Sequence, residues 1–256
     1  MTTHLALLFA LSLDSNPSSD AHLHLSNGDN HFQCGRLATA EAEYREAVRI
    51  LENTPSAELA LALNNLGTTL AGRHEYERAL PVLRRANRMA QQFLTSEQRF
   101  QIQGNTAQVM IRLGDYSAAR PLVDQVVSFA EAANQPYLLY ALLSRAAIFT
   151  AALDWDGAQK DIDRVLQSID NHHPLAPNAH ALRATAWQRA GNHRLAVNEF
   201  AIALELGDRT PYWIHTSDAT DIIDSYSVSL RKTGQRRRAK ALVQEVNNRK
   251  RINPTP

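Results

Sequence analysis

The 256-residue sequence is short of aromatic residues, glycine and cysteine, and each shortage argues against a class of protein. Aromatic residues make up 7% of the chain and glycines number ten, which disfavours an all-β sandwich and a glycine-rich nucleotide-binding fold. Cys34 is the one cysteine, so a disulfide framework within the chain is excluded. Alanine, leucine, arginine and glutamate are frequent throughout, and these residues favour helices.

Long apolar runs are also missing, since none approaches the roughly 18 residues that a membrane-spanning helix needs. Residues 1–20 contain one apolar stretch, residues 5–13, which has the length of a signal-peptide core. It lacks a basic residue ahead of it and a clear cleavage site. We expect it to cap the first repeat of a cytoplasmic protein; the alternative is that residues 1–20 direct export.

Net positive charge is concentrated at the end of the chain. Residues 231–251 contain nine basic residues and one acid, Glu245, and so carry +8. Because the whole chain has a formal charge of +1, residues 1–230 carry −7. The basic end, which includes a tail at 250–256, is expected to be a solvated cap or to attract phosphates or an acidic partner. No aromatic residue is interleaved with the cations, so nucleic acid is not the expected partner.

The sequence repeats with a period near 40 residues, which is the sign of a stacked repeat protein. The repeat is marked by Ala40, Ala79, Ala119, Ala158, Ala196 and Ala239. Four residues after each alanine stand Tyr44, Leu83, Val123, Ile162, Phe200 and Val243. Twelve residues before each stand the small residues Gly28, Gly67, Ala107, Ala146, Ala184 and Ser227. Small residues on a first helix therefore let a second helix with bulky residues approach closely.

A turn between the two helices is predicted five residues before each alanine. This column reads Gly35, His74, Gly114, Leu153, Gly191 and Gly234. Glycine is typical of such a turn because it adopts left-handed backbone conformations without steric strain. One such helix pair cannot bury its own apolar face, so the pairs must stack on one another.

These columns resemble the tetratricopeptide repeat family, most clearly at residues 65–86 and 114–120. The resemblance covers about residues 21–250 and implies an all-α, right-handed superhelical solenoid of six repeats: 21–54, 57–93, 96–133, 136–172, 176–208 and 214–249. The long period is similar to that of kinesin light chains and bacterial sensor or scaffold proteins. Pro55, Pro136, Pro174 and Pro211 place the extra length in the second helix or the loop after it. Thr95 or Ser96 is expected to cap the repeat that lacks such a proline.

The resemblance implies that the first helices line a concave surface that binds an extended peptide or a partner protein. The residues expected there are Asn64, Asn65, Thr68, Gln101, Asn105, Gln108, Arg112, Tyr140 and Ser144. Carboxamides both donate and accept hydrogen bonds, so they can pair with a peptide backbone. The alternative is that these amides tie adjacent helices together. A family clamp for terminal carboxylates is not matched, because Asn64, Gln101 and Asn105 occupy positions that require basic residues.

Other constellations in the sequence are weaker. His22, His24, His31 and Cys34 invite a metal site, but the face they share is predicted to pack on the second helix, and no metal or other cofactor is expected. No catalytic motif is found, so the chain is not expected to be an enzyme. Arg145 and Arg183 stand at normally apolar positions and imply partial exposure or an ion pair.

The sequence therefore predicts a non-catalytic scaffold for an unknown protein or peptide. Two alternatives stay open. The solenoid could be a homo-oligomer that assembles through residues 5–13, or a regulatory sensor module that acts on a separate enzyme or transcription factor.

Overall fold

A computed structural model describes residues 20–209 and 217–252, and there it contains helices and no strand. The helices are α1 (Asp20–Gln33), α2 (Leu37–Leu51), α3 (Ala57–Gly72), α4 (Tyr76–Phe93), α5 (Ser96–Arg112), α6 (Tyr116–Ala132), α7 (Leu138–Ala151), α8 (Trp155–Ser168), α9 (Ala176–Arg189), α10 (His193–Asp208), α11 (Ser217–Lys232) and α12 (Arg236–Ile252). The predicted all-α fold is confirmed. The predictions for residues 5–13, Pro211 and residues 253–256 lie outside the described ranges.

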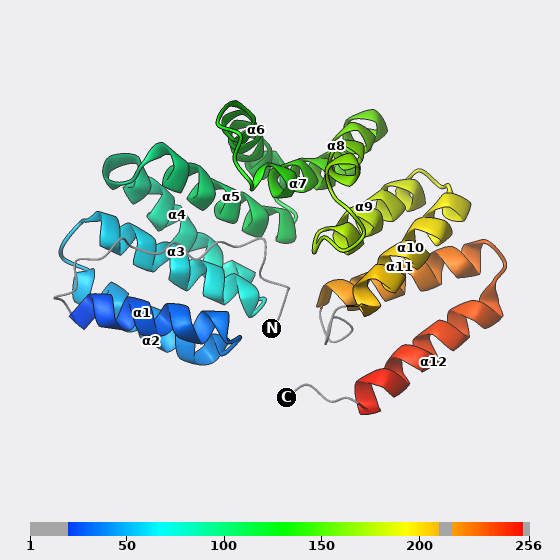
Figure 1. Cartoon of the computed structure of the whole chain (residues 1–256), viewed down its shortest axis with the longest axis horizontal. Helices are drawn as coiled ribbons and strands as arrows, with labels where there is room; N and C mark the ends of the chain where they lie inside the picture. The colour runs from blue at the N-terminus through cyan, green and yellow to red at the C-terminus, as the bar shows by residue number, and fades with distance from the viewer. Residues whose placement is uncertain (1–19, 210–216, 253–256) are drawn as a thin grey trace. The chain divides into compact units, whose positions relative to one another are not determined.

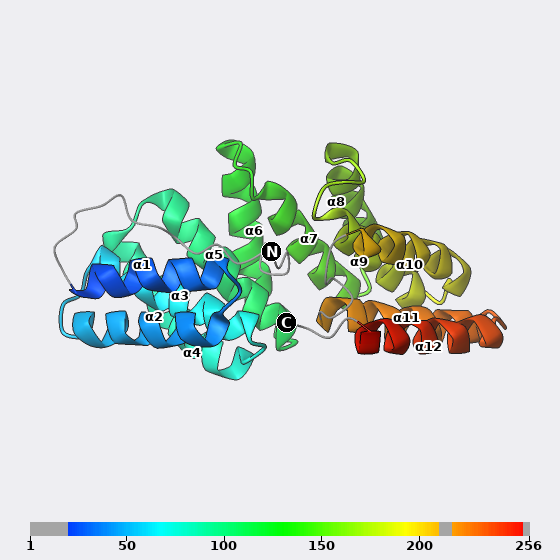
Figure 2. The same ribbon diagram turned by 60° about the horizontal axis from the view of Figure 1, so that its bottom comes forward.

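The chain divides into two compact units within α7, unit 1 (Met1–Ala141) and unit 2 (Leu142–Pro256). In unit 1 each helix from α1 to α6 packs on the next, and α3 also contacts α5 (Figure 1). In unit 2 the helices from α8 to α12 pack in the same consecutive way, and α9 contacts α11. Figure 2 shows α11 and α12 side by side. Each unit is therefore a stack of helix pairs, as the repeat predicts.

The turn inside each pair has a left-handed residue at the position that the sequence marks. At Gly35, His74, Gly114, Leu153, Gly191 and Gly234, φ lies between 61° and 81°. The reversal is closed by backbone bonds such as Glu75 N to Leu70 O at 3.0 Å and His74 N to Ala71 O at 2.9 Å. These are the bonds of a helix-terminating Schellman motif. His74 and Leu153 adopt the conformation without being glycine, which is costly for a residue with a Cβ atom.

The small and large columns meet between the two helices of a pair. A Cβ atom added to Gly28 would lie 2.5 Å from Tyr44 Cε1, and one added to Gly67 would lie 2.5 Å from Leu83 Cγ. Neither position has room for a side chain, so glycine sets how closely α1 approaches α2 and α3 approaches α4. The predicted small–large pairing is confirmed in both pairs.

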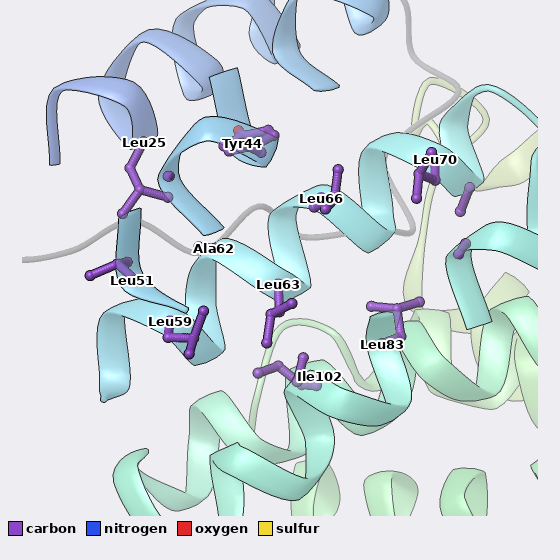
Figure 3. Close-up of a cluster of buried hydrophobic side chains, with 14 of the residues drawn as sticks. Leu25, Tyr44, Leu51, Leu59, Ala62, Leu63, Leu66, Leu70, Leu83 and Ile102 are labelled. Atoms are coloured by element: carbon purple, nitrogen blue, oxygen red, sulfur yellow. The ribbon is translucent and has the colours of Figure 1, made fainter. Parts of the chain in front are cut away.

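The core of unit 1 is continuous from α1 to α5. Leu25, Tyr44, Leu59, Leu83 and Ile102 belong to one buried cluster, and side chains from successive helices meet there (Figure 3). The cluster joins residues of successive helix pairs, and burial stabilises the stack by about 1.5–3 kcal/mol for each large aliphatic side chain. Stacking therefore supplies the burial that one pair cannot.

Unit 2 has a second cluster built on the same columns. Phe200 and Leu230 are fully buried, Tyr226 is nearly so, and the half-buried Trp187 packs against them. Trp155 begins α8 and is also half-buried. The large residues thus lie where the repeat register predicts them.

Helix starts follow local sequence signals. Thr95 caps α5 in a capping box, in which its side chain accepts from Gln98 N and its backbone N–H donates to the Gln98 side chain. Asp115, Asp154 and Asn192 cap α6, α8 and α10 through their side-chain oxygens. These contacts satisfy backbone N–H groups that have no partner within the first helical turn. The expected cap at Thr95 is confirmed.

Candidate functional site

The polar residues predicted for the inner surface centre on α3, a helix buried along most of its length. Every residue from Leu59 to Ala71 is buried, including Asn64, Asn65 and Thr68. Buried amides and hydroxyls are destabilising unless they are hydrogen-bonded. The bonds that these side chains make therefore decide what they do.

A row of hydrogen bonds runs across the first helices of three successive pairs. Asn105 Nδ2 on α5 donates to Asn64 Oδ1 at 3.0 Å, and Asn64 Nδ2 donates to Asn65 Oδ1 at 3.1 Å. Asn65 Nδ2 then donates to Asp29 Oδ1 on α1 at 3.2 Å. Tyr44 OH on α2 donates to the same Asp29 oxygen at 2.6 Å. We call Asp29, Asn65, Asn64 and Asn105 the amide row. It confirms that these amides tie adjacent helices together.

Asp29 is the one carboxylate in the amide row, and its surroundings alter its chemistry. Burial raises the pKa of Asp29, while the hydrogen bonds from Tyr44 and Asn65 and the charge of His22 oppose that rise in part. Burial and the adjacent Asp29 raise the pKa of Tyr44, so its hydroxyl remains a donor. The row therefore ends on α1 at Asp29, whose Oδ1 accepts hydrogen bonds from both Tyr44 and Asn65.

Thr68 turns toward its own helix. Its Oγ1 donates to the backbone oxygen of Asn65 at 3.0 Å, and Thr69 Oγ1 donates to the same oxygen at 2.7 Å. Two hydroxyls on one carbonyl oxygen fix the backbone at the residue that carries the amide row. In this position Thr68 supports Asn65 from within α3.

The remaining predicted residues of α5 lie closer to solvent. Gln101 and Gln108 are half-buried and Arg112 is exposed, and together with Asn105 they follow the spacing of one helix face. Gln101 Oε1 is buried and has no hydrogen-bond partner among the described residues. A buried acceptor without a hydrogen bond lowers the stability of the folded state by about 1–3 kcal/mol. This face of α5 therefore combines exposed polar groups with one unmet acceptor.

Tyr140 and Ser144 both lie on α7 and are half-buried. Tyr140 belongs to unit 1, and burial raises the pKa of its hydroxyl. Ser144 belongs to unit 2. Seven of the nine predicted residues thus lie on α3 and α5, and of the other two Tyr140 lies in the same unit and Ser144 in unit 2.

Ion pairs occupy two repeat positions in unit 2 whose counterparts in repeat two are apolar. Arg145 forms a two-pronged contact with Asp161, with Nε to Oδ2 at 2.7 Å and Nη2 to Oδ1 at 2.8 Å. Arg183 Nη2 lies 3.0 Å from Glu199 Oε1. The ion-pair interpretation of both arginines is confirmed. Asp161 and Glu199 each stand three residues after the repeat alanine, which is the signal that would have identified them as partners.

A histidine joins the second of these pairs. His180 Nδ1 lies 2.8 Å from Glu199 Oε2. Burial opposes the charge of Glu199, but the hydrogen bond from His180 and the charge and bond of Arg183 outweigh it and hold its pKa below the ordinary value. In repeat one, His24 Nδ1 lies 2.7 Å from Glu43 Oε2 at the same spacing. His24 thus pairs with α2, the helix on which its face was predicted to pack.

The other suggested ligands lie apart from any ligand set. Cys34 is exposed at the turn after α1. Among the residues that the structure describes, no three His, Cys, Asp or Glu side chains gather as they would around a metal ion. Within the same ranges, no helix combines the length and apolar character needed to cross a membrane.

Comparison with known proteins gives the same architecture. A model of the tetratricopeptide repeat family matches residues 19–92, and no curated protein sequence matches the chain. Among solved structures, NprR in complex with its cognate peptide NprX is 13% identical, with a TM-score of 0.75 over 90% of this chain and 67% of that one. Rap protein complexed with Competence and Sporulation Factor is 14% identical, with a TM-score of 0.64 over 92% and 66%.

A third solved structure is a tetratricopeptide repeat protein from Parabacteroides merdae, 18% identical, with a TM-score of 0.58 over 89% of this chain and 79% of that one. The chain spans about two thirds of the length of the NprR and Rap chains. At these identities the likeness concerns the fold alone.

Proposed function

Because residues 19–92 belong to the tetratricopeptide repeat family and the later helix pairs share its fold, we propose that this protein is a non-catalytic scaffold for an extended peptide or partner segment. The binding surface we propose is the face of unit 1 that carries the amide row and the polar stripe of α5. NprR, a protein of similar fold, was solved in complex with its cognate peptide NprX, which supports a peptide as the class of partner.

The observation that carries the proposal is the stripe Gln101, Gln108 and Arg112 beside the amide row. The Gln101 side chain is half-buried and its oxygen has no donor in the part of the chain that the structure describes, so a peptide backbone N–H would satisfy it once the side chain turns outward. Gln108 offers both a donor and an acceptor, and Arg112 offers a cation for an acidic group or a carbonyl. A polar surface of this kind recognises the peptide backbone with little demand on its side chains.

The amide row has a supporting role in this proposal. Asn64, Asn65 and Asn105 are buried and, with Asp29, hold α1, α3 and α5 in register, so the stripe on α5 keeps a fixed distance from the neighbouring helices. Tyr140 would extend the surface at the end of unit 1. Preorganised side chains lose less entropy on binding, which favours affinity.

The test is selection of peptides from a displayed random library on the full chain, followed by affinity measurements on two variants. Gln101→Ala with Gln108→Ala removes two amides of the stripe. Gln91→Ala with Gln92→Ala removes two exposed amides of α4 and is the matched control. We expect the selected peptides to bind the first variant at least about tenfold more weakly and the control unchanged.

Equal affinity for the stripe variant and the wild type would refute the proposed surface. A second double variant, Asn65→Ala with Asn105→Ala, separates support from contact. We expect it to lose about 1–3 kcal/mol of unfolding free energy, because it removes buried hydrogen bonds between helices. Loss of peptide binding with unchanged stability would instead show that these amides contact the peptide directly.

A further inference from the structure

A concentrated basic surface lies at the turn between α11 and α12, far along the chain from the stripe of α5. Six exposed side chains form it, and we call them the basic surface: Arg231, Lys232, Arg236, Arg237, Arg238 and Lys240. They come from the last turn of α11 and the first turns of α12. Their closeness follows from the short turn at Gly234, which reverses the chain within a few residues.

No ion pair joins the basic surface to a carboxylate within residues 20–209 and 217–252. Arg231 Nη1 donates to Ser227 Oγ at 2.8 Å, and Arg238 Nη1 donates to Gln235 Oε1 at 3.2 Å, both neutral acceptors. Elsewhere, arginines of the helix pairs contact acids, as Arg78 contacts Glu41 and Arg145 contacts Asp161. The cations at this turn repel one another, and an anion would relieve that repulsion.

The position of the arginines on α12 adds to the repulsion. Arg236, Arg237 and Arg238 occupy the first turn of the helix, where the helix dipole is positive and favours acidic residues. By contrast α4 has Glu77 in its first turn and α8 has Asp156. Three cations at this end are therefore unfavourable for the folded chain by itself and favourable for the capture of negative charge.

We propose that the basic surface binds a short acidic peptide segment of another protein. This site is separate from the stripe of α5 and does not depend on it. Guanidinium groups contact carboxylates with two parallel hydrogen bonds, and four of the six cations are arginines. Several such contacts on adjacent helical turns match a run of glutamates or aspartates.

Two other anionic partners fit the surface less well. Single-stranded nucleic acid is bound by stacking its bases on aromatic rings, and the basic surface contains no aromatic residue. A membrane-surface helix exposes large apolar residues beside its cations, and residues 236–248 of α12 include no exposed large apolar side chain. Residues 1–230 carry −7, which repels a long polyanion but leaves a short segment free to bind the local cations.

The test uses the full chain and a fluorescein-labelled peptide of eight glutamates, with binding followed by fluorescence anisotropy. Arg236→Glu with Arg237→Glu reverses two charges of the basic surface. Arg84→Glu with Arg88→Glu reverses two exposed arginines of α4 and changes the net charge by the same amount. Glutamate in the first turn of α12 suits the helix dipole, so the first variant is expected to fold, as circular dichroism would verify.

We expect the wild type to bind the peptide and to lose at least about tenfold in affinity between about 50 mM and about 300 mM sodium chloride. The α12 variant should bind at least about tenfold more weakly than the wild type, and the α4 variant within about twofold of it. The proposal fails if the wild type does not bind or if both variants weaken equally. It also fails if a 20-base-pair DNA duplex or vesicles containing phosphatidylserine bind more tightly than the peptide.

Discussion

Repeat two in unit 1 and repeats four and five in unit 2 solve one packing problem in two ways. In repeat two, Leu66 stands thirteen residues before the repeat alanine and Val82 stands three residues after it. Leu66 belongs to the apolar cluster of unit 1, and Val82 packs against that cluster. The same two positions hold Arg145 and Asp161 in repeat four. In repeat five they hold Arg183 and Glu199, which are also paired.

The difference shows that the fold fixes which positions face each other but not the chemistry of the contact. An apolar pair is stabilised by burial, whereas an ion pair must first be stripped of water and then regain that energy from its partner. Either pair fills the space between a first and a second helix. Three substitutions test how interchangeable the two solutions are and a fourth compares the turns of the two units; they follow from the largest expected effect to the smallest.

The largest effect is expected from removal of the buried acid in repeat four. Asp161 is almost fully buried, and both of its carboxylate oxygens accept hydrogen bonds from the Arg145 guanidinium. Asp161→Ala should lower the free energy of unfolding by about 4 kcal/mol, because it deprives a largely buried guanidinium of this carboxylate. Urea unfolding followed by circular dichroism measures the change.

The matched control copies the residues of repeat two into repeat four. Arg145→Leu with Asp161→Val should stay within about 1 kcal/mol of the wild type, since buried ion pairs are often replaced by apolar residues without loss. If the double variant were as unstable as Asp161→Ala, the two solutions would not be interchangeable in unit 2.

The reverse exchange tests repeat two. Leu66→Arg with Val82→Asp places an ion pair inside the apolar cluster of unit 1, where Leu66 is buried. We expect a loss of about 2 kcal/mol in the free energy of unfolding, from the lost burial of Leu66 and the desolvation of both charges. Unchanged stability in the same urea experiment would show that unit 1 tolerates either chemistry.

The third substitution uses pH to separate ionic from apolar packing. The folded state holds the pKa of Glu199 below its ordinary value of 4.5, so the unfolded chain takes up the proton first as pH falls. The stability from Glu199 is therefore present above pH 4.5 and is lost as pH falls through the lowered folded pKa. Glu199→Gln should cost about 1.5 kcal/mol at neutral pH and much less in acid.

Leu66→Ala in repeat two is the control for that pH dependence. It removes apolar burial and no titratable group, so its effect on stability should be the same in neutral and acidic solution. Parallel pH profiles for the two variants would contradict the assignment of Glu199 as a charged partner.

The smallest effect concerns the turns, where His74 and Asn134 in unit 1 and Leu153 in unit 2 are left-handed without being glycine. Leu153 in unit 2 has a φ of 61° and is exposed, so Leu153→Gly should raise the free energy of unfolding by about 1 kcal/mol. Gly191→Ala, at the same place in the next repeat, should lower it by about as much. Opposite shifts in melting temperature would confirm that the strain lies in the backbone.

The fold was predictable because the repeat states the same packing rule six times. Gly28 and Gly67 stand opposite Tyr44 and Leu83, and the sequence alone places these residues in the contacting columns. The turn at His74 was also predictable, although histidine there gives no local signal, because its column contains glycine in other repeats. The repeat register thus predicts a turn even where the residue itself has no preference for one.

The candidate site was predictable only in part, because a register gives the face of a residue and not its partner. Asn65 and Asn105 were placed on the correct helices, but Asp29 and Tyr44, which anchor the amide row, were not singled out. Whether an amide contacts its neighbour or a ligand depends on side-chain torsions and burial, which periodicity does not encode. The opposite charges of Arg145 and Asp161 indicate an ion pair, but only when the two repeat columns that contain them are compared.

Trp187 packs against the core of unit 2, and the tryptophans also give the chain a built-in optical label. All three tryptophans of the sequence, Trp155, Trp187 and Trp213, follow residue 141 and so belong to unit 2. Native tryptophan emission therefore reports one half of the molecule, while circular dichroism reports the helices of both. Unfolding curves from the two signals, recorded on one unmodified sample, distinguish halves that melt together from halves that melt one after the other.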